Sequence, residues 1–217
     1  MIRFLYADAL AAHPALARGM FRDRAAQFRD RLGWAVAVDP TGQERDAYDA
    51  LRPLYVIWQD AAGRHGGSLR LLPSTGRTMV NEHFLHLTGG VSIRDPLIWE
   101  CSRFCLSEGT GAHVSAALML GALEFGLASG LAHSVGVFDN RMVRVYRRLG
   151  WPPTILGAVG HGRNAVAAGL WDFEASMRYG FCQRARVSAA EVAGWLADDL
   201  GATWRPDAAP LRLAARA

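Results

Sequence analysis

Segments of strand length alternate with helical segments along this chain. Apolar and β-branched residues dominate the segments that we interpret as strands, which are residues 1–10, 54–60, 67–74, 97–106, 131–138, 153–160 and 164–173. Helical spacing of apolar residues, or a capping pair, marks the segments that we interpret as helices, which are residues 14–32, 79–87, 114–130, 140–151 and 188–200. This mixture predicts a fold of the α/β (α+β) class, with a central sheet flanked by helices.

The chain has 217 residues, which is long enough for one well-packed domain and does not require a second. We expect residues 1–200 to form that domain and residues 201–217 to be a mobile tail. Hydrophobic residues make up 51% and charged residues 20% of the chain, as in ordinary soluble globular proteins. No apolar run has membrane-spanning length, and the first ten residues are too polar for a secretory signal. We therefore expect no association with a membrane.

The cysteines and histidines lack the spacing of a metal site. Cys101, Cys105 and Cys182 form no C-x-x-C pair, and among the histidines only His83 and His86 are close together. We therefore expect no bound metal. Unpaired, reduced cysteines are typical of cytoplasmic proteins, so the cytoplasm is the expected location.

The net charge of +4 comes almost wholly from arginine. A positive charge of this kind indicates one of two things. It belongs either to an ordinary solvated surface or to a surface that binds a partner carrying phosphates or acidic groups. In the predicted helix 140–151, Arg141, Arg144 and Arg148 fall on one face and apolar residues on the other. The same charge would suit nucleic acid, but no fingerprint of a nucleic-acid-binding module is present, so we expect no nucleic-acid partner.

Two charged residues interrupt the apolar segment 97–106. Glu100 and Arg103 lie inside it, although a folded chain rarely buries a carboxylate or a guanidinium group without a reason. They are either a structural ion pair or part of a reactive cleft. In a regular strand Ser102 would share the face of Glu100, while Arg103 would point the other way. A β-bulge between them would let both side chains serve one pocket.

Four short motifs bring acids, arginines and aromatic residues together in a fixed order. They are R-x3-F-x5-W from Arg24, E-x-D-x2-D from Glu44, R-L-x-P from Arg70 and W-E-x-S-R-F from Trp99. One such motif is weak evidence, but their joint order and spacing are specific. Together they resemble the acyl-homoserine-lactone synthases, the LuxI-type autoinducer synthases, over about residues 24–151. The resemblance implies a GNAT-like acyltransferase fold, whose mixed central sheet splays apart to form a cleft.

The resemblance also implies an enzyme that makes a quorum-sensing signal. Such an enzyme joins an acyl group from a thioester to the amine of S-adenosylmethionine, closes the lactone and releases methylthioadenosine. Both reactants are substrates, so no cofactor is implied. The ammonium group must lose a proton before it attacks the thioester. Glu100 is the implied general base, and Asp46 and Ser102 complete the implied catalytic set.

S-adenosylmethionine carries a sulfonium, an ammonium and a carboxylate, which need different partners. Asp46 and Asp49 suit the cationic groups, whereas Arg24 and Arg103 either bind the carboxylate or brace the acids. Aromatic faces suit the adenine or the sulfonium. The residues implied to bind or support this substrate are Arg24, Phe28, Trp34, Glu44, Asp46, Asp49, Arg70, Phe84 and Arg103. Taken singly, the phenylalanines would be core residues and the aspartates solvated loop acids.

The implied acyl donor is acyl-carrier protein or acyl-CoA, for which the basic face of helix 140–151 is a docking surface. The acyl chain would lie where the sheet splays, lined by Trp99, Leu118, Met119, Leu123, Val137, Met142 and Tyr146. Members that make 3-oxo products carry a threonine in the strand after the central helix, where this chain has Gly136 or Val137. On that comparison we expect an unsubstituted, branched or aryl acyl group.

Two other functions stay open at this point. One is a GNAT-like N-acyltransferase that acts on a different amine, and the other is a binding protein with a basic face and no catalysis. The acids, arginines and aromatic residues before residue 50 argue against the first alternative, because a general acetyltransferase has no need for them. Glu100 inside an apolar strand argues against the second.

Overall fold

Seven strands form one mixed sheet in the computed structural model, which describes residues 1–162 and 165–201. The strands lie side by side in the order β1-β2-β3-β4-β5-β7-β6. Their bounds are Ile2–Tyr6 (β1), Leu54–Gln59 (β2), His65–Pro73 (β3), Ile98–Leu106 (β4), His133–Asp139 (β5), Thr154–Val159 (β6) and Val166–Asp172 (β7). Neighbouring strands are antiparallel except β4 and β5, which are parallel. The sheet is therefore mixed, as expected.

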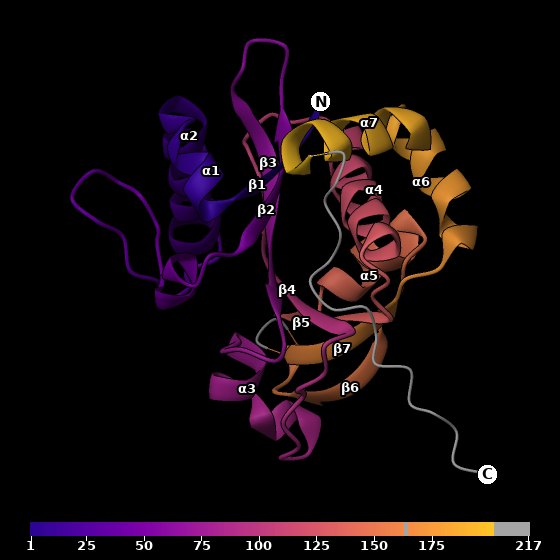
Figure 1. Cartoon of the computed structure of the whole chain (residues 1–217). Coiled ribbons are helices and arrows are strands. Elements are labelled where there is room, and N and C mark those ends of the chain that lie inside the picture. Colours follow the sequence, from indigo (N-terminus) through magenta and orange to yellow (C-terminus); the bar gives the residue numbers. More distant parts are fainter. Residues whose placement is uncertain (163–164, 202–217) are drawn as a thin grey trace.

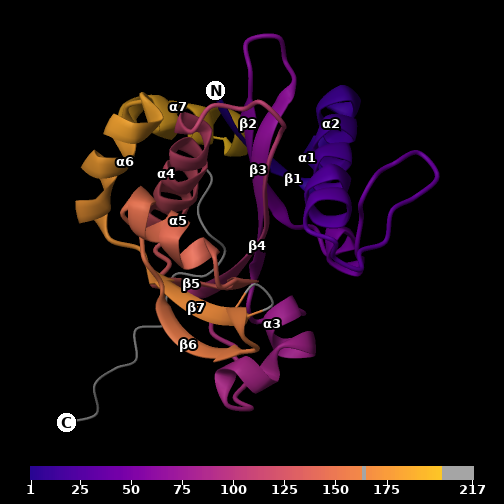
Figure 2. The same cartoon turned by 180° about the vertical axis from the view of Figure 1, so that it is seen from behind.

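Helices cover both faces of this sheet. Their bounds are Ala7–Ala11 (α1), Pro14–Ala25 (α2), Met79–His83 (α3), His113–Ala128 (α4), Met142–Leu149 (α5), Arg178–Ala185 (α6) and Ala189–Leu200 (α7). Figures 1 and 2 show α1 and α2 on one side of the strands β1 to β4, and α4, α6 and α7 on the other side. Among the described residues no helix is long and apolar enough to cross a membrane.

The sheet splays apart between β4 and β5. The two strands pair only over Ile98–Glu100 and His133–Val135, and β4 continues to Leu106 paired with β3 alone. Gly136 lies where the strands part, and a Cβ there would come within 2.8 Å of the Cys101 carbonyl oxygen. Only glycine fits this close backbone approach without a shift. The expectation of a splayed sheet is confirmed, and Figure 1 shows its two halves turning away from each other.

A β-bulge interrupts β4 at Arg103. Ser102 and Cys105 of β4 face Arg70 and Ser68 of β3, so two residues on β4 stand opposite one on β3. Arg103 itself has φ +55°, in the left-handed region that non-glycine residues seldom adopt. The bulge turns the Arg103 side chain out of the regular alternation. The predicted bulge is therefore confirmed.

The main core lies between α4 and the sheet. Residues 114–126 of α4 are all buried, because the sheet covers one side of this helix and α6 and α7 cover the other. Its one charged residue in that span, Glu124, is paired with Arg178 of α6 at 2.5 Å. A smaller cluster, formed by residues such as Leu10, Met20 and Ile57, fixes α1 and α2 against the other face of β1 and β2. This second cluster sets the position of α2 relative to β3 and β4.

Most predicted elements are present. The predicted helix 14–32 is α2 followed directly by a π-helical turn at Ala26–Arg31, and Gly33 after it has φ +69°. The capping pair at the start of α7 is confirmed, since the Ser188 hydroxyl accepts from Glu191 N and the Glu191 carboxylate accepts from Ser188 N. Helix α6 was not predicted, and the predicted strand 1–10 is wrong in its second half, where Ala7–Ala11 is the helix α1. The predicted tail, except Gly201, lies outside the described residues.

Candidate active site

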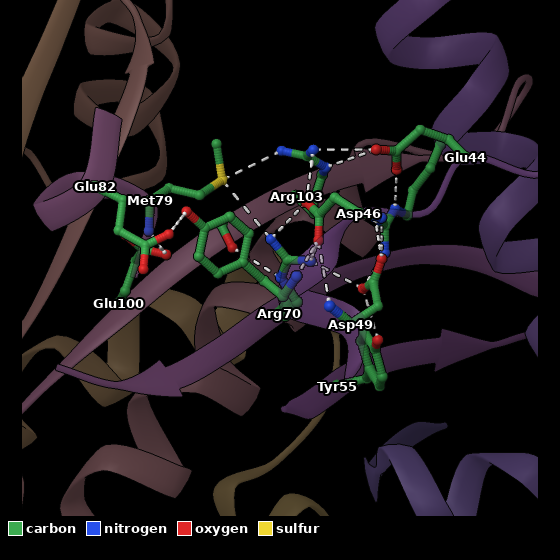
Figure 3. Close-up of polar contacts among 12 residues, drawn as sticks. Glu44, Asp46, Asp49, Tyr55, Arg70, Met79, Glu82, Glu100 and Arg103 are labelled. Atoms are coloured by element: carbon green, nitrogen blue, oxygen red, sulfur yellow. Dashed lines mark hydrogen bonds and ion pairs between the residues drawn. The ribbon is translucent and has the colours of Figure 1, made fainter. Parts of the chain in front are cut away.

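Three arginines and three carboxylates alternate in a closed ring of ion pairs (Figure 3). In order around the ring they are Arg24, Glu44, Arg103, Asp46, Arg70 and Asp49, which contacts Arg24 again. We call this set the ion-pair ring. Each arginine contacts two acids and each acid contacts two arginines, so the six charges cancel.

Distances in the ion-pair ring are those of strong, charge-assisted hydrogen bonds. Arg24 donates to Glu44 at 2.5 Å and to both oxygens of Asp49 at 2.9 and 3.0 Å. Arg70 donates to both oxygens of Asp46 at 2.5 and 3.0 Å. Arg103 closes the ring with ion pairs of 3.0 Å to Glu44 and 2.7 Å to Asp46.

Four elements and the loop that carries Glu44 supply the ion-pair ring. The arginines come from α2, β3 and the bulge in β4, and two of the acids come from a 3₁₀ turn at Ala47–Ala50 and its N-cap. The Asp46 carboxylate caps that turn by accepting from Tyr48 N and Asp49 N, while Asp49 accepts from Asp46 N at 2.8 Å. This reciprocal capping fixes both aspartates relative to each other. The spacing D-x-x-D is the sequence signal for it.

Most of the ion-pair ring is out of contact with water. Side-chain exposure is 1% for Arg24 and 0% for Arg70 and Glu44, whereas Asp46 keeps 18%. Burial alone would raise the pKa of Asp49, but Arg24 and Arg70 hold it well below its usual range. Asp46 is therefore the acid of the ring that is most accessible to a ligand.

Glu100 stands beside the ion-pair ring and has different partners. It is 1% exposed, and its carboxylate accepts from Met79 N at 3.1 Å and from Val80 N at 2.7 Å, at the start of α3. Burial raises the pKa of Glu100, against the lowering effect of these two hydrogen bonds. Arg103 is paired with Glu44 and Asp46 instead. The two charged residues of β4 are therefore not a mutual ion pair.

Two further side chains contact the arginines of the ion-pair ring, and one of them, Met79, also donates its backbone N–H to Glu100. Ser102 accepts from Arg70 Nε at 3.1 Å. The Met79 thioether lies 3.7 Å from Arg70 Nη2 and 3.4 Å from Arg103 Nη1, as Figure 3 shows. The sequence did not point to Met79, because its position depends on how α3 meets β3 and β4. Tyr55 is a second such residue, since its hydroxyl donates to Asp49 at 2.7 Å.

The aromatic candidates divide into two groups. Phe28 and Trp34 are stacked with centroids 5.2 Å apart, and the Arg103 guanidinium carbon lies 5.4 Å from the Phe28 ring centre. Phe28 is 3% exposed and Trp34 is 38% exposed, so Trp34 presents aromatic surface to solvent next to the ring. Phe84 follows α3 and contacts His83 and His86. The structure thus brings Phe28 and Trp34 to the site, but shows no contact between Phe84 and the ion-pair ring among the described residues.

The predicted acyl-pocket residues lie in the main core or next to it. Within the main core lie Leu118, Met119, Leu123 and Tyr146, with Trp99 and Met142 packed against it. Val137 is half-buried on β5 beside this cluster. On α5, Arg144 and Arg148 are exposed as expected, whereas Arg141 is paired with Asp139.

No group of three or more His, Cys, Asp or Glu side chains that could hold a metal ion occurs in residues 1–162 and 165–201. The three cysteines are unpaired, and Cys105 is buried. Burial raises the pKa of the Cys101 thiol to about 12, so this thiol stays protonated near neutral pH.

Comparison with known proteins gives a consistent result. A family model described as autoinducer synthase matches residues 9–178. An acyl-homoserine-lactone synthase of Rhizobium etli is 42% identical over 182 residues, which cover 81% of this chain and 85% of that protein. Eighteen characterised proteins match this chain with significance.

Solved structures agree with the sequence relatives. The CoA-dependent acyl-homoserine lactone synthase MesI superposes with a TM-score of 0.77 at 25% identity, covering 87% of this chain and 96% of its own. The structure of BjaI, a CoA-dependent acyl-homoserine lactone synthase with SAM and isopentyl-CoA, gives 0.76 at 26% identity, covering 86% and 90%. An N-acetyltransferase from Lactobacillus plantarum gives 0.54 at 15% identity, covering 80% and 99%, which shows the shared acyltransferase fold alone.

Proposed function

The chain belongs to the autoinducer synthase family, and we propose that it acylates the amine of S-adenosylmethionine and closes the product to an acyl-homoserine lactone. It is an acyltransferase with a GNAT-like fold. The observation that carries the mechanism is the position of Glu100. Glu100 is the last residue of β4 that pairs with β5. Its buried carboxylate therefore lies between the ion-pair ring and the splayed side of the sheet.

The ion-pair ring suits one wall of the S-adenosylmethionine site. Asp46 is its most exposed acid, so its carboxylate would face the ammonium or the sulfonium of the substrate. Arg24 and Asp49 are buried behind it, which supports the bracing role for Arg24 rather than direct contact with the substrate carboxylate. Trp34, stacked on Phe28, offers an exposed face to the adenine.

Glu100 suits the role of general base. It would take a proton from the substrate ammonium, directly or through one water, and its raised pKa makes it a better proton acceptor than an ordinary glutamate. The neutral amine then attacks the thioester carbonyl, the new C–N bond forms, and the C–S bond to the carrier breaks. The nitrogen loses its second proton in this step, and the departing thiolate takes up a proton to leave as the thiol. In the second step the substrate carboxylate attacks the carbon bonded to the sulfonium, the ring closes and methylthioadenosine leaves.

The donor would be acyl-CoA or an acyl-carrier protein. Arg144 and Arg148 are exposed on α5, next to the acyl-pocket residue Tyr146, and fit the phosphates or acidic surface of such a donor. Because the reaction is complete with two substrates, we propose no cofactor and no metal. Nucleic acid and membranes are not proposed as partners, and the unpaired cysteines fit a cytoplasmic location.

A product assay tests this proposal. The purified protein is incubated with S-adenosylmethionine and a panel of acyl thioesters, and the products are identified by mass. We expect an acyl-homoserine lactone and methylthioadenosine in equal amounts. Acylation of another amine without release of methylthioadenosine would instead show a general N-acyltransferase and would contradict the proposal.

A further inference from the structure

Tyr48 connects the turn that carries Asp46 with the helix that contacts Glu100. Its main-chain N–H donates to the Asp46 carboxylate at 2.9 Å, within the 3₁₀ turn at Ala47–Ala50. Its hydroxyl donates to the Glu82 carboxylate of α3 at 2.7 Å. Tyr48 is only 4% exposed, so water competes little for this hydroxyl. One residue thus contacts both the most accessible acid of the ion-pair ring and a side chain of α3.

Helix α3 fixes Glu100 through its main chain. The N–H groups of Met79 and Val80 donate to the Glu100 carboxylate at 3.1 and 2.7 Å, and Figure 3 shows the first of these bonds beside the ion-pair ring. The helix has only five residues. A helix this short is not stable by its own hydrogen bonds, so its orientation depends on contacts with the rest of the protein.

Three side-chain contacts orient α3. Glu82 accepts from the Tyr48 hydroxyl, and it also accepts from Arg77 at 2.6 and 3.0 Å on the surface. The Asn81 amide exchanges two hydrogen bonds of 2.8 Å with the main chain of Ile93. Of these three contacts, only that with Tyr48 reaches the turn that carries two acids of the ion-pair ring.

We propose that Tyr48 and Glu82 are a positioning pair, whose hydrogen bond fixes Glu100 relative to the acid that faces the substrate cation. This inference rests on the proposed function. Without the bond α3 would shift, its two main-chain hydrogen bonds to Glu100 would weaken, and the carboxylate would move relative to the substrate nitrogen. A displacement of about 1 Å at a catalytic group can lower the rate by about 100-fold. The pair acts through Glu100 and does not itself touch the reacting atoms.

The positioning pair does not change its charge near neutral pH. Hydrogen bonds from Arg77 and from Tyr48 lower the pKa of Glu82 to about 2. Burial, followed by the hydrogen bond to Glu82, raises the pKa of Tyr48. Glu82 therefore stays an acceptor and Tyr48 stays a donor throughout an assay near neutral pH. A change in the pH dependence of turnover then reports on Glu100.

The surroundings of Glu100 give the direction of that change. Burial raises the pKa of Glu100, whereas the two α3 amides lower it. Among the charged groups near it, Arg70 on β3 lowers the pKa and Asp46 raises it, while the thiol of Cys101 and the phenol of Tyr48 are neutral. Weaker amide hydrogen bonds raise the pKa further. The acidic decrease of kcat therefore begins at a higher pH when the positioning pair is broken.

Turnover measured against pH tests the proposal. Tyr48→Phe removes the hydroxyl but keeps the ring, whose centre lies 5.5 Å from the Arg70 guanidinium carbon. We expect kcat at neutral pH to fall by about ten- to a hundredfold, with its acidic decrease moved to a higher pH and KM for S-adenosylmethionine little changed. The control is Tyr179→Phe, since Tyr179 is 75% exposed on α6 and its change should leave the pH profile as it is.

Two replacements of Glu82 separate the hydrogen bond from the ion pair with Arg77. Glu82→Ala removes the acceptor of the Tyr48 hydroxyl and should reproduce the profile of Tyr48→Phe. Glu82→Gln removes the ion pair but keeps a carbonyl oxygen for that hydroxyl, so its profile should stay close to that of the unmodified protein.

The outcomes separate this inference from the proposed function. An unshifted pH profile in Tyr48→Phe or in Glu82→Ala would overturn the inference while lactone formation stands. A shift in Glu82→Gln as large as in Glu82→Ala would assign the effect to the ion pair and would overturn it as well. Absence of lactone from the unmodified protein would overturn the proposed function itself. The pH at which the decrease begins does not depend on the folded fraction, so a variant of low stability still decides.

Discussion

Main-chain N–H groups, rather than a cation, hold the carboxylate of Glu100. The N–H groups of Met79 and Val80 keep it in place, while every arginine of the ion-pair ring is engaged by other acids. Glu100 has no salt-bridge partner in the described part of the chain, and a buried, oriented carboxylate of this kind can take up a proton at moderate cost. This combination distinguishes Glu100 from the acids of the ring, each of which contacts two arginines.

Replacement of Glu100 by glutamine tests its role as the base. Glu100→Gln keeps the size of the side chain and one acceptor oxygen for the α3 amides, but removes the proton acceptor. We expect kcat to fall by about 10²- to 10⁴-fold, with little change in the thermal unfolding temperature. Glu174→Gln, an exposed change after β7, serves as the control. Normal turnover by Glu100→Gln would exclude Glu100 as the base.

The pH dependence of turnover provides a second test at this residue. Glu100 must be deprotonated to accept a proton, and burial raises its pKa above the ordinary value of a glutamate. As the pH falls through this raised pKa, Glu100 takes up a proton and kcat should decrease, starting at a higher pH than for an exposed glutamate. The remaining activity of Glu100→Gln should lack this acidic decrease. An unchanged acidic decrease in the variant would assign it to another group.

At the scale of elements, the ion-pair ring ties α2, β3 and β4 to the segment that precedes β2. All three arginines are needed to neutralise the negative charges of its acids. Water cannot replace an arginine there, because Glu44 is fully buried and Asp49 nearly so. Breaking one pair leaves an uncompensated buried charge, which costs more than the pair itself contributes.

The stability of an Arg24→Ala variant tests this view. The change leaves Glu44 and Asp49 without one of their partners in a buried site. We expect the free energy of unfolding to fall by about 3–5 kcal/mol, measured by urea denaturation. Arg22→Ala, an exposed change on the same helix, should alter it by less than about 0.5 kcal/mol. Equal stability of the two variants would show that the ring does not hold these elements together.

The sequence predicted the members of this arrangement better than their contacts. Periodicity identified the strands and α2, α4, α5 and α7, because each has an apolar face or a capping signal. Helix α6 has neither, since only Phe181 and Ala185 of its eight residues are buried. The motifs named all six residues of the ion-pair ring, but their mutual pairing depends on the bulge at Arg103 and on the strand register. The position of Met79 in the site depends on the same strand register, and no local sequence pattern predicts that register.

At the scale of the whole molecule, some arginines are paired with acids and others are exposed on the surface. The arginines of the ion-pair ring are neutralised, and Arg141 is paired with Asp139, while Arg144 and Arg148 stay exposed on α5. The excess charge therefore lies on the surface and not in the substrate site. This distribution fits long-range attraction of a phosphate-bearing or acidic donor.

Charge reversal on α5 tests the docking surface. The double change Arg144→Glu and Arg148→Glu should raise KM for the thioester donor by about tenfold at low salt, with less effect at high salt, because exposed charges are screened. KM for S-adenosylmethionine should stay the same. The control is the double change Arg18→Glu and Arg22→Glu, which has the same spacing and charge on the exposed side of α2. An equal effect of both double changes would mean that only net charge matters.

The central claim is that the ion-pair ring and Glu100 line one site for S-adenosylmethionine, and a structure determined with this substrate bound tests it most directly. The account predicts the substrate nitrogen within about 3 Å of the Glu100 carboxylate, or one water away, with Asp46 against a cationic group of the substrate. Binding at another surface, or with the nitrogen turned away from Glu100, would contradict the account.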